Sequence, residues 1–492
     1  MRTAGVMPVI LLQLAAMTIL AALLGTWQDE EYTLATTAHG IAYAFSRSIS
    51  FELQAPLYFC LLAALRLLNS SPLFARMFSV LAACGVTFVA ARIALRIWPQ
   101  RSPRAFALLV AFNPFVVYAA VEIRLYALTL LVSGALWLAF DAGYLRGERS
   151  NARARIATIV LALAGAYLQY FLIFQLVASA VALLVARRRR AFVAYAAAMV
   201  PVAVLFVPMA LKVRSQVGGA FSVATSRSGD QARVLVHPFL DFMLPLAYEA
   251  IAGPFRHAIT YTLVAAVVVL FFAGRPRLDR RTASIVTIAL GIEALYLFVA
   301  DVMHYELSPP RHFVALFVPE VVAVYAVVAR FRGPWAARSA TALAMIIGLA
   351  SVASVATDFR ALAKHGDWSR VGAMLSATVR PGDAIAVFPA DGALPLSRFY
   401  HGPGRIVPFP RTQPPDRYDV DALLVHSQKE AVDALARLPQ NGRLWFVFYG
   451  PCGQSDFYGC LELRSAIDRR YRAVEARTFF ENSVTRLIPR SR

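Results

Sequence analysis

Three consecutive acidic residues, Asp29, Glu30 and Glu31, follow directly after the first apolar run of the chain, residues 8–26. A carboxylate at the edge of a membrane is partly desolvated, and such a group can accept a proton from a hydroxyl or amine, or can bind a divalent cation. The other interpretation is the solvated beginning of an acidic loop, because adjacent acids are common. The residue types make Asp29 and Glu30 candidates for acid–base chemistry and leave metal binding open.

Two arginines, Arg124 and Arg311, are candidates for binding phosphate because each is expected on a turn at the end of an apolar run. The planar fork of a guanidinium matches two phosphate oxygens. Both arginines could instead be interfacial residues whose charged heads reach toward water. Other candidates at the same membrane face are Glu122, Tyr126, Tyr170 and His312. The two tyrosines would equally suit an aromatic belt.

The composition indicates what kind of chain must position these groups. Of the 492 residues, 59% are hydrophobic and 16% are charged, whereas an average soluble domain carries about a quarter charged residues. Such a chain lacks the charge to cover a water-exposed surface of its size. The composition excludes a purely cytosolic enzyme, a disordered protein and a collagen-like fibre, and it predicts a polytopic α-helical membrane protein.

The formal net charge of +20 would suit a nucleic-acid-binding protein, but the positions of the basic residues favour a membrane topology. Five short basic clusters lie between apolar runs, at residues 96–104, 142–155, 187–190, 274–281 and 330–338. The positive-inside rule predicts such clusters in cytoplasmic loops. The sequence contains no Gly-rich phosphate loop, RNA-binding signature or zinc-finger spacing, so we expect no nucleic-acid partner.

Placing every basic cluster on the cytoplasmic side requires that one early apolar run does not cross the membrane. Residues 55–68 are the run that fails to cross, because 14 helical residues span about 21 Å against a hydrocarbon core of about 30 Å. We expect an interfacial helix there and a second interfacial segment at residues 238–252. About eleven transmembrane helices result, at residues 8–26, 76–95, 105–120, 125–141, 156–169, 171–186, 191–210, 257–273, 283–300, 312–330 and 339–357. This odd number places residues 358–492 outside the cytoplasm.

The segment after the last span differs in character. Strand-like runs at residues 384–388 and 444–449 alternate with helix-like runs, at residues 368–379, 428–438 and 463–475. This alternation predicts a small α/β domain, so we divide the chain into a transmembrane domain, 1–357, and a periplasmic α/β domain, 358–492. Cys452 and Cys460 flank a Gly-rich turn, and in an oxidising periplasm they would either pair or remain two free thiols.

Short segments of the chain resemble, in order, motifs of the GT-C class of membrane glycosyltransferases. The resemblance is to the bacterial relatives of protein O-mannosyltransferases, family 39, and to the aminoarabinose transferase that modifies lipid A. The segments are WQDEEY at 27–32, QAPLY at 54–58, EIRLYAL at 122–128, YF at 170–171, PRHF at 310–313, and DW at 367–368 followed by RPGD at 380–383. Together they span essentially the whole membrane region.

The resemblance implies roles for the matching residues. Asp29 corresponds to the catalytic carboxylate that approaches the acceptor, and Glu30 corresponds to its neighbour. Arg124 and Arg311 correspond to groups that bind the lipid-linked phosphate. The other residues that we predict at the substrate site are Gln54, Tyr58, Glu122, Tyr126, Tyr170 and His312. The chain departs from the family's HPPLYY motif, whose His is replaced here by Gln54, so no role of that His transfers.

The function that the resemblance implies is an inverting glycosyltransferase of the bacterial inner membrane. Its donor would be a polyprenyl-phosphate-linked sugar, and its acceptor would be a polysaccharide, glycolipid or protein at the periplasmic face. A second hypothesis is a transporter or flippase of lipid-linked sugars, but the two halves show no repeat and the polar residues gather at one face instead of the midplane. A third is a structural or assembly subunit. No cofactor is implied with certainty, and a divalent cation is possible.

Overall fold

A computed structural model describes residues 4–146, 151–217, 279–303, 313–331, 334–438, 443–450 and 458–490, with a few single positions between 218 and 278. Internal contacts divide the chain into two compact units. The first unit comprises Met1–Ala22, Gly40–Ile49 and Gln54–Asp358, and the second comprises Leu23–His39, Ser50–Leu53 and Phe359–Arg492. The acidic segment after the first apolar run therefore belongs to the same compact unit as the C-terminal part of the chain.

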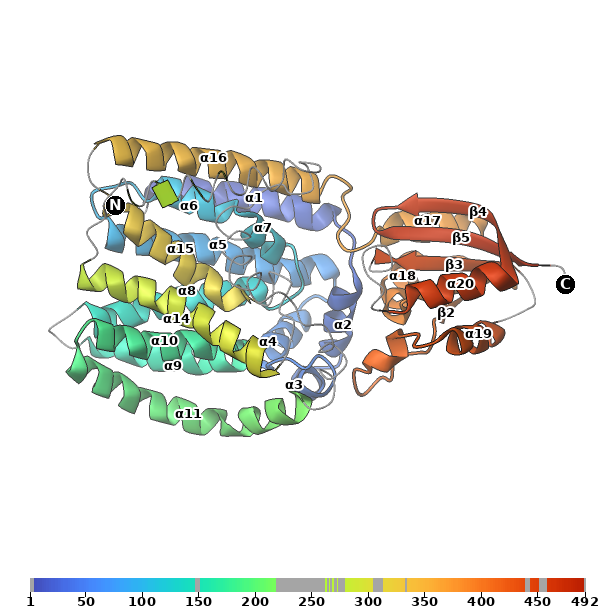
Figure 1. Cartoon of the computed structure of the whole chain (residues 1–492), viewed down its shortest axis with the longest axis horizontal. Coiled ribbons are helices and arrows are strands. Elements are labelled where there is room, and N and C mark those ends of the chain that lie inside the picture. Colours follow the sequence, from blue (N-terminus) through green and yellow to red (C-terminus); the bar gives the residue numbers. More distant parts are fainter. Residues whose placement is uncertain are drawn as a thin grey trace. The chain divides into compact units, whose positions relative to one another are not determined.

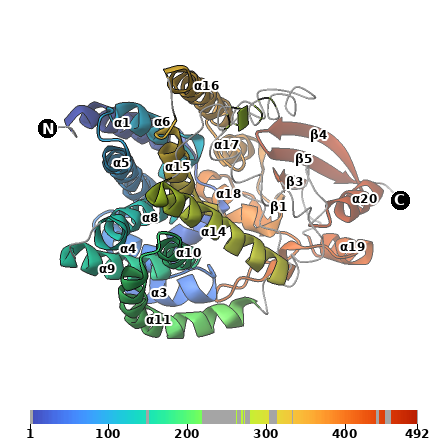
Figure 2. The same ribbon diagram turned by 60° about the vertical axis from the view of Figure 1, so that its left-hand side comes forward.

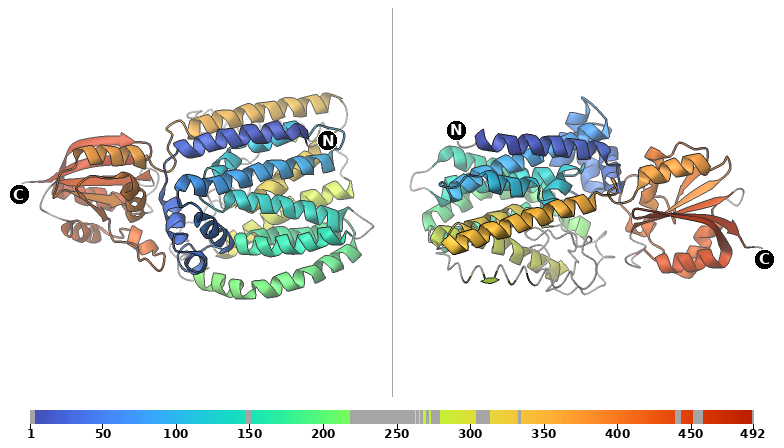
Figure 3. Two further views of the ribbon diagram at one scale, coloured as in Figure 1. Left: turned by 180° about the vertical axis from the view of Figure 1, so that it is seen from behind. Right: turned by 90° about the horizontal axis from the view of Figure 1, so that it is seen from above.

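The first unit is a bundle of helices (Figure 1). The described helices of this bundle are α1 (Met7–Leu23), α3 (Ile41–Ser50), α4 (Leu57–Arg66), α5 (Pro72–Ile97), α6 (Arg104–Ala111), α7 (Pro114–Ala120), α8 (Tyr126–Phe140), α9 (Ala152–Leu168), α10 (Leu172–Val185), α11 (Arg189–Val217), α14 (Arg280–Met303), α15 (Val314–Val328) and α16 (Pro334–Asp358). A π-helical turn, Asp141–Leu145, extends α8. The long helices lie side by side, with their axes roughly aligned (Figure 3).

Among the described residues, five helices are long and apolar enough to cross a membrane, and a sixth span results if α1 and α2 (Gln28–Thr36), which meet at 96°, are counted together. The described helices confirm a polytopic membrane protein, but they do not confirm the predicted number of eleven spans. The interfacial segment at 238–252 lies outside the described residues, and only single positions of the span at 257–273 are described. Helix α4 has 10 residues, in agreement with the prediction that this segment is too short to cross.

The span predicted over residues 105–120 is wrong as a single helix, because α6 ends at Ala111 and α7 begins at Pro114. Between them, the Asn113 side chain accepts a hydrogen bond from the backbone amide of Phe115 at 2.9 Å. An Asn N-cap followed by Pro at the first helical position is a strong signal for the start of a new helix. The sequence contained this signal within an otherwise continuous apolar run.

Basic residues gather at one end of the bundle. The carboxylate of Asp141, which is fully buried, contacts the guanidiniums of Arg96, Arg146 and Arg281 at 3.3, 3.5 and 2.9 Å. Asp141 follows the last residue of α8, whereas the turn at residues 121–125 precedes the first residue of that helix. The basic cluster and the predicted phosphate-binding turn therefore lie at opposite ends of α8, as the topology deduced from the basic clusters requires.

The second unit contains a five-stranded sheet in the order β2-β1-β3-β5-β4. The strands are β1 (Ala384–Phe388), β2 (Arg405–Pro408), β3 (Leu444–Tyr449), β4 (Tyr471–Phe479) and β5 (Asn482–Pro489). Strand β1 is parallel to both β2 and β3, and β5 is antiparallel to β3 and β4. The predicted strands at 384–388 and 444–449 are confirmed, with the same bounds.

Helices cover both faces of this sheet (Figure 2). They are α17 (Trp368–Thr378) and α18 (Ala393–Phe399) on one face, and α19 (Gln428–Ala436) and α20 (Cys460–Arg470) on the other. Successive residues of β1 point to opposite faces, so Val387 packs in the core with α17 and α18 while Phe388 packs in the core with α19 and α20. Because both faces are buried, β1 is a continuous apolar run.

Two details of this unit bear on the sequence-based expectations. The helix predicted over residues 463–475 is wrong at its C-terminal end, because α20 ends at Arg470 and β4 begins at Tyr471. Strand β4 pairs with β5, and this pairing outweighs the helical pattern of the residues before it. Cys460 is disulfide-bonded, and Cys60 and Cys84 are free. Cys452 lies outside the described residues.

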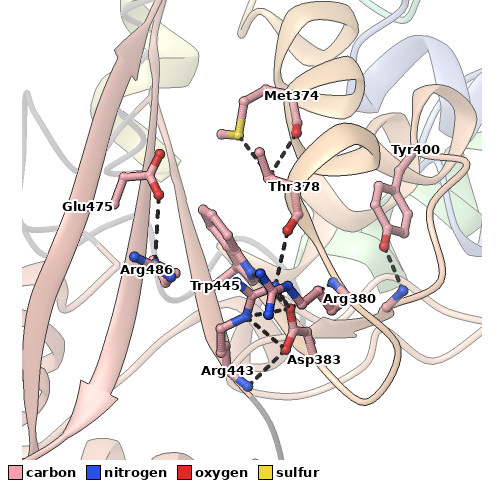
Figure 4. Close-up of polar contacts among 10 residues, drawn as sticks. Met374, Thr378, Arg380, Asp383, Tyr400, Arg443, Trp445, Glu475 and Arg486 are labelled. Atoms are coloured by element: carbon pink, nitrogen blue, oxygen red, sulfur yellow. Dashed lines mark hydrogen bonds and ion pairs between the residues drawn. The ribbon is translucent and has the colours of Figure 1, made fainter.

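The turn that enters β1 is tied to the start of β3 by the carboxylate of Asp383 (Figure 4). The carboxylate accepts hydrogen bonds from the backbone amides of Arg380 and Arg443, at 2.8 and 2.9 Å, and from the Arg443 guanidinium at 2.8 Å. Burial alone would raise the pKa of Asp383, but these hydrogen bonds and the charge of Arg443 outweigh burial and lower the pKa to about 2. The carboxylate is therefore a structural anchor of the parallel strands.

We expect Asp383→Asn to lower the free energy of unfolding by about 2–3 kcal/mol, because charged hydrogen bonds to a buried group are lost. A folded-state pKa below the unfolded value stabilises the protein above about pH 4, and this contribution disappears as the pH falls toward 2. Thermal unfolding of the full chain should therefore differ between wild type and variant at pH 7 and converge at acid pH. Asp433→Asn, at an exposed position on α19, is the control. An equal effect of both substitutions would contradict the anchor.

Candidate functional site

The acidic residues after the first apolar run lie on a helix. Asp29, Glu30 and Glu31 form the first turn of α2, where the helix dipole stabilises negative charge. Glu30 is fully buried and Glu31 is nearly so. The interpretation of this segment as a solvated loop is therefore wrong for these two glutamates. Asp29 is half-buried.

Glu30 is held by a buried ion pair. Its carboxylate lies 2.8 Å from the ammonium of Lys364, and the two side chains are 0% and 2% exposed. Lys364 lies just before a turn at Gly366, which has a φ of +91° and where a Cβ atom would come within 2.5 Å of Asn482. Only glycine fits this position, so the turn fixes the direction of the lysine. Glu30 therefore has the environment of an anchoring group.

Glu31 is held by a second ion pair, to a different element. The guanidinium of Arg398 on α18 donates two hydrogen bonds to the Glu31 carboxylate, one of them at 2.7 Å. Such a bidentate pair fixes orientation as well as distance. The two ion pairs attach the first turn of α2 to Lys364, which precedes α17, and to Arg398, which lies on α18.

Uncharged side chains complete the attachment of α2. The side-chain amide of Gln28 donates a hydrogen bond to the hydroxyl of Tyr449, the last residue of β3. The ring of Trp27 packs against His365, with centroids 4.2 Å apart. The ring of Tyr32 lies edge-on to Phe51, at 5.0 Å. The acidic turn is thus positioned by the sheet and its helices, through contacts that join residues more than 300 positions apart.

One acidic residue of the C-terminal segment lies beside Asp29. Asp391, in the short 3₁₀ helix Ala390–Gly392 after β1, is 8% exposed. Burial and then the charge of Asp29 raise the pKa of Asp391 to about 7, although backbone amides donate hydrogen bonds to its carboxylate. Burial also raises the pKa values of Tyr32 and Tyr449, and the charges of Asp391 and Asp29 contribute to both shifts. Two carboxylates and two phenols therefore form one cluster.

The predicted residues of the first unit form a separate group. Glu122, Arg124 and Tyr126 lie at and after the turn between α7 and α8, and all three are buried. The rings of Tyr126 and Tyr118 are stacked, with centroids 6.0 Å apart. A buried glutamate and a buried arginine two residues apart are unusual at a helix junction and fit a polar site better than a membrane-surface position.

The remaining predicted residues are distributed around the first unit. Tyr58 on α4 is 1% exposed and stacks on Phe78, with ring centroids 5.8 Å apart, so it is an aromatic core residue. The backbone amide of Gln54 donates a hydrogen bond to Ser48. The hydroxyl of Tyr170, between α9 and α10, lies 3.5 Å from the sulfur of Met209. Arg311 and His312 lie outside the described residues.

Sequence reasoning missed Lys364, Arg398, Asp391 and Tyr449. Neither Lys364 nor Asp391 belongs to the segments that resemble known motifs, and no spacing connects them to residues 27–32. Within the described ranges, no three His, Cys, Asp or Glu side chains come together as ligands for a metal ion. The arrangement on α2 offers a half-buried carboxylate, Asp29, that is positioned by its neighbours and adjoins a second carboxylate.

Comparison with known proteins places the fold. No protein-family model matches the chain, and no curated protein matches it by sequence. The chain is similar to the crystal structure of ArnT from Cupriavidus metallidurans bound to undecaprenyl phosphate, with a TM-score of 0.54, 15% identity and coverage of 98% of both chains. The apo structure of that protein matches with a TM-score of 0.53 and 13% identity over 98% of both chains. The chain therefore has the ArnT-like fold of the GT-C class, a polytopic helical membrane part followed by a small sheet.

Proposed function

We propose that the protein is an inverting glycosyltransferase that transfers a sugar from a polyprenyl-phosphate-linked donor to an acceptor at the periplasmic face of the inner membrane. The observation that carries this proposal is the fold shared with ArnT over 98% of both chains, because one of the matching structures holds undecaprenyl phosphate. The acidic turn of α2 supplies a carboxylate, Asp29, of the kind that such a transfer needs.

In the proposed reaction, Asp29 accepts a proton from the acceptor hydroxyl or amine, or orients that group. The acceptor oxygen or nitrogen forms a bond to the anomeric carbon from the side opposite the phosphate. The bond between that carbon and the phosphate oxygen breaks, and the lipid phosphate leaves with the electron pair. A guanidinium stabilises the charge on the departing phosphate.

The two glutamates beside Asp29 have a different role in this proposal. Because Glu30 and Glu31 are engaged by Lys364 and Arg398, they anchor α2 and hold Asp29 in place. Glu30 is therefore proposed as a positioning residue and not as a second catalytic carboxylate. The basic cluster around Asp141 supports the proposed orientation, since the positive-inside rule places it in the cytoplasm and the other end of α8 outside.

The test of this function is a donor panel. We expect the purified protein, given a series of undecaprenyl-phosphate-linked sugars and cell-envelope acceptors, to release undecaprenyl phosphate only when donor and acceptor are both present. The measurement is separation of lipid phosphate from lipid-linked sugar by chromatography. Movement of intact lipid-linked sugar across the bilayer of a vesicle, without release of lipid phosphate, would instead indicate a transporter.

A further inference from the structure

Arginines of three helices meet at one end of the first unit. Arg96 lies in the last turn of α5, Arg146 follows the π-helical turn after α8, and Arg281 lies in the first turn of α14. Their guanidiniums contact one carboxylate, that of Asp141, which is fully buried, whereas the arginine side chains are between 24% and 40% exposed. Because one carboxylate neutralises only one of three guanidiniums, this Asp141 cluster has an excess of positive charge that is accessible from outside the protein.

Part of the Asp141 cluster has a structural role. The Nη1 atom of Arg96 donates a hydrogen bond to the backbone carbonyl of Leu138 at 2.7 Å. The guanidiniums of Arg146 and Arg281 donate to the backbone carbonyl of Arg96. Arginines at the C-terminal ends of helices bond the last carbonyls and compensate the helix dipole. These contacts explain why the three arginines gather here, but in the described part of the chain they engage only the Nη1 atom of Arg96.

Arg92, one turn earlier on α5, has no such structural role. Its side chain is exposed, and it makes no hydrogen bond or ion pair within the described ranges. It nevertheless lies five residues before the end of a helix, Pro72–Ile97, that is long and apolar enough to cross a membrane. A charged side chain within a span is costly unless it is paired or reaches the interface. We therefore look for the partner of Arg92 at the level of the lipid headgroups.

The face of α5 that carries Arg92 is apolar toward the middle of the span. Leu81 and Phe88 are 57% and 44% exposed. Leu81, Phe88, Arg92 and Arg96 follow one another at intervals of seven, four and four residues, which is the spacing of one helix face. Arg92 and Arg96 are thus about 6 Å apart along the helix axis. This face presents exposed apolar side chains followed by guanidiniums, the order in which a phospholipid presents its acyl chains and its phosphate.

We propose that this face of α5 binds an anionic phospholipid, with acyl chains along Leu81 and Phe88 and the headgroup phosphate at Arg92 and Arg96. The planar fork of a guanidinium matches two phosphate oxygens. The excess charge of the Asp141 cluster favours a headgroup with net negative charge, such as phosphatidylglycerol, over a zwitterionic one. This inference goes beyond the proposed sugar transfer and does not depend on it.

The test is lipid binding by the full chain in detergent, measured by native mass spectrometry during titration with phosphatidylglycerol or phosphatidylcholine. We expect the wild type to retain phosphatidylglycerol at lower lipid concentrations than phosphatidylcholine. Arg92→Gln should weaken the binding of phosphatidylglycerol about 5-fold, which is what one arginine contributes near an anionic membrane surface. Equal binding of the two lipids by the wild type overturns the proposal, as does an unchanged affinity of the Arg92→Gln variant for phosphatidylglycerol.

Further variants separate a local contact from the general charge of the protein. Arg338→Gln removes one charge from an exposed position on α16 and is the matched control, whose affinity should equal that of the wild type. Arg92→Lys keeps the charge and should lose less affinity than Arg92→Gln. An equal loss in Arg338→Gln and Arg92→Gln contradicts a site on α5, and an equal loss in the two Arg92 variants contradicts recognition of the phosphate charge.

The Tm of each lipid-free variant shows whether it is folded. Because Arg92 makes no hydrogen bond or ion pair in the described part of the chain, Arg92→Gln should have the Tm of the wild type. If this variant does not fold, Arg146→Gln is measured in the same way, since the Arg146 side chain is 40% exposed and belongs to the Asp141 cluster. Retention of wild-type affinity by that variant would then count against the proposal.

Inorganic phosphate distinguishes a lipid headgroup from a free anion. It should not displace phosphatidylglycerol at comparable concentrations, because it makes no contact with the apolar side chains of Leu81 and Phe88. Displacement would show a site for a small anion and would overturn the assignment to a lipid. None of these measurements uses sugar transfer, so a failure of this inference is distinguishable from a failure of the proposed function.

Discussion

Asp29→Asn is expected to reduce sugar transfer by a factor of about 10² to 10⁴, which is the usual contribution of a general base and corresponds to roughly 3–5 kcal/mol of activation free energy. Asparagine has nearly the same shape as aspartate, so donor binding should be retained. Its side-chain amide cannot accept the proton, so transfer should be lost. The hydrogen bond that Thr33 donates in this turn goes to the backbone carbonyl of Asp29 and survives the substitution. The helix loses one charge from its first turn, which costs about 0.3–1 kcal/mol.

The measurement is release of undecaprenyl phosphate at saturating donor, together with Tm of the same preparation. Asp468→Asn, at an exposed position on α20, is the control for the loss of one carboxylate from the second unit. A large loss of transfer in the Asp29 variant, with unchanged Tm and an active control, supports its role. Wild-type transfer by the Asp29 variant would refute the assignment and with it the mechanism proposed above.

The sequence predicted local features of this fold and the type of fold. Strands 384–388 and 444–449 were predicted because their apolar residues are continuous, and the structure gives the same bounds. The GT-C resemblance rested on seven short segments in order, and the likeness to ArnT confirms it at the level of the fold. Composition and basic clusters were enough to identify a polytopic membrane protein.

The count of spans and the break at Asn113 could not be deduced from hydropathy alone. A window average does not distinguish one helix over 105–120 from two short helices, since the residues on both sides of Asn113 are apolar. The break between the two helices is indicated by only two residues, the N-cap Asn113 and the following Pro114. A capping signal within an apolar run deserves as much weight as the run itself.

The tertiary contacts of the three acidic residues could not be predicted from the sequence either, for a different reason. Three adjacent acids look alike in a sequence, yet each has different neighbours in the fold. Glu30 contacts Lys364, Glu31 contacts Arg398, and Asp29 lies beside Asp391. Each partner is more than 300 residues away, and local spacing carries no information about such contacts. Tertiary structure thus divides one acidic motif into two anchors and one candidate base.

The anchor at Lys364 gives the largest expected effect on stability. Lys364→Met removes the ammonium that lies 2.8 Å from the fully buried carboxylate of Glu30, and breaking a buried ion pair in this way costs about 3–5 kcal/mol. Replacing both partners by uncharged groups of similar size often costs much less, because no charge then remains buried. The double variant Glu30→Gln, Lys364→Met should therefore be more stable than Lys364→Met alone.

The measurement is a double-mutant cycle by chemical denaturation of the full chain in detergent, with transfer assayed on each variant. We expect the double variant to recover at least half of the lost stability, while its transfer rate stays below that of the wild type because α2 has lost its attachment through Glu30 and Lys364. Additive losses in stability would contradict a buried pair. Full recovery of transfer in the double variant would show that the pair stabilises the fold without positioning Asp29, since the attachment through Glu31 and Arg398 would then be sufficient.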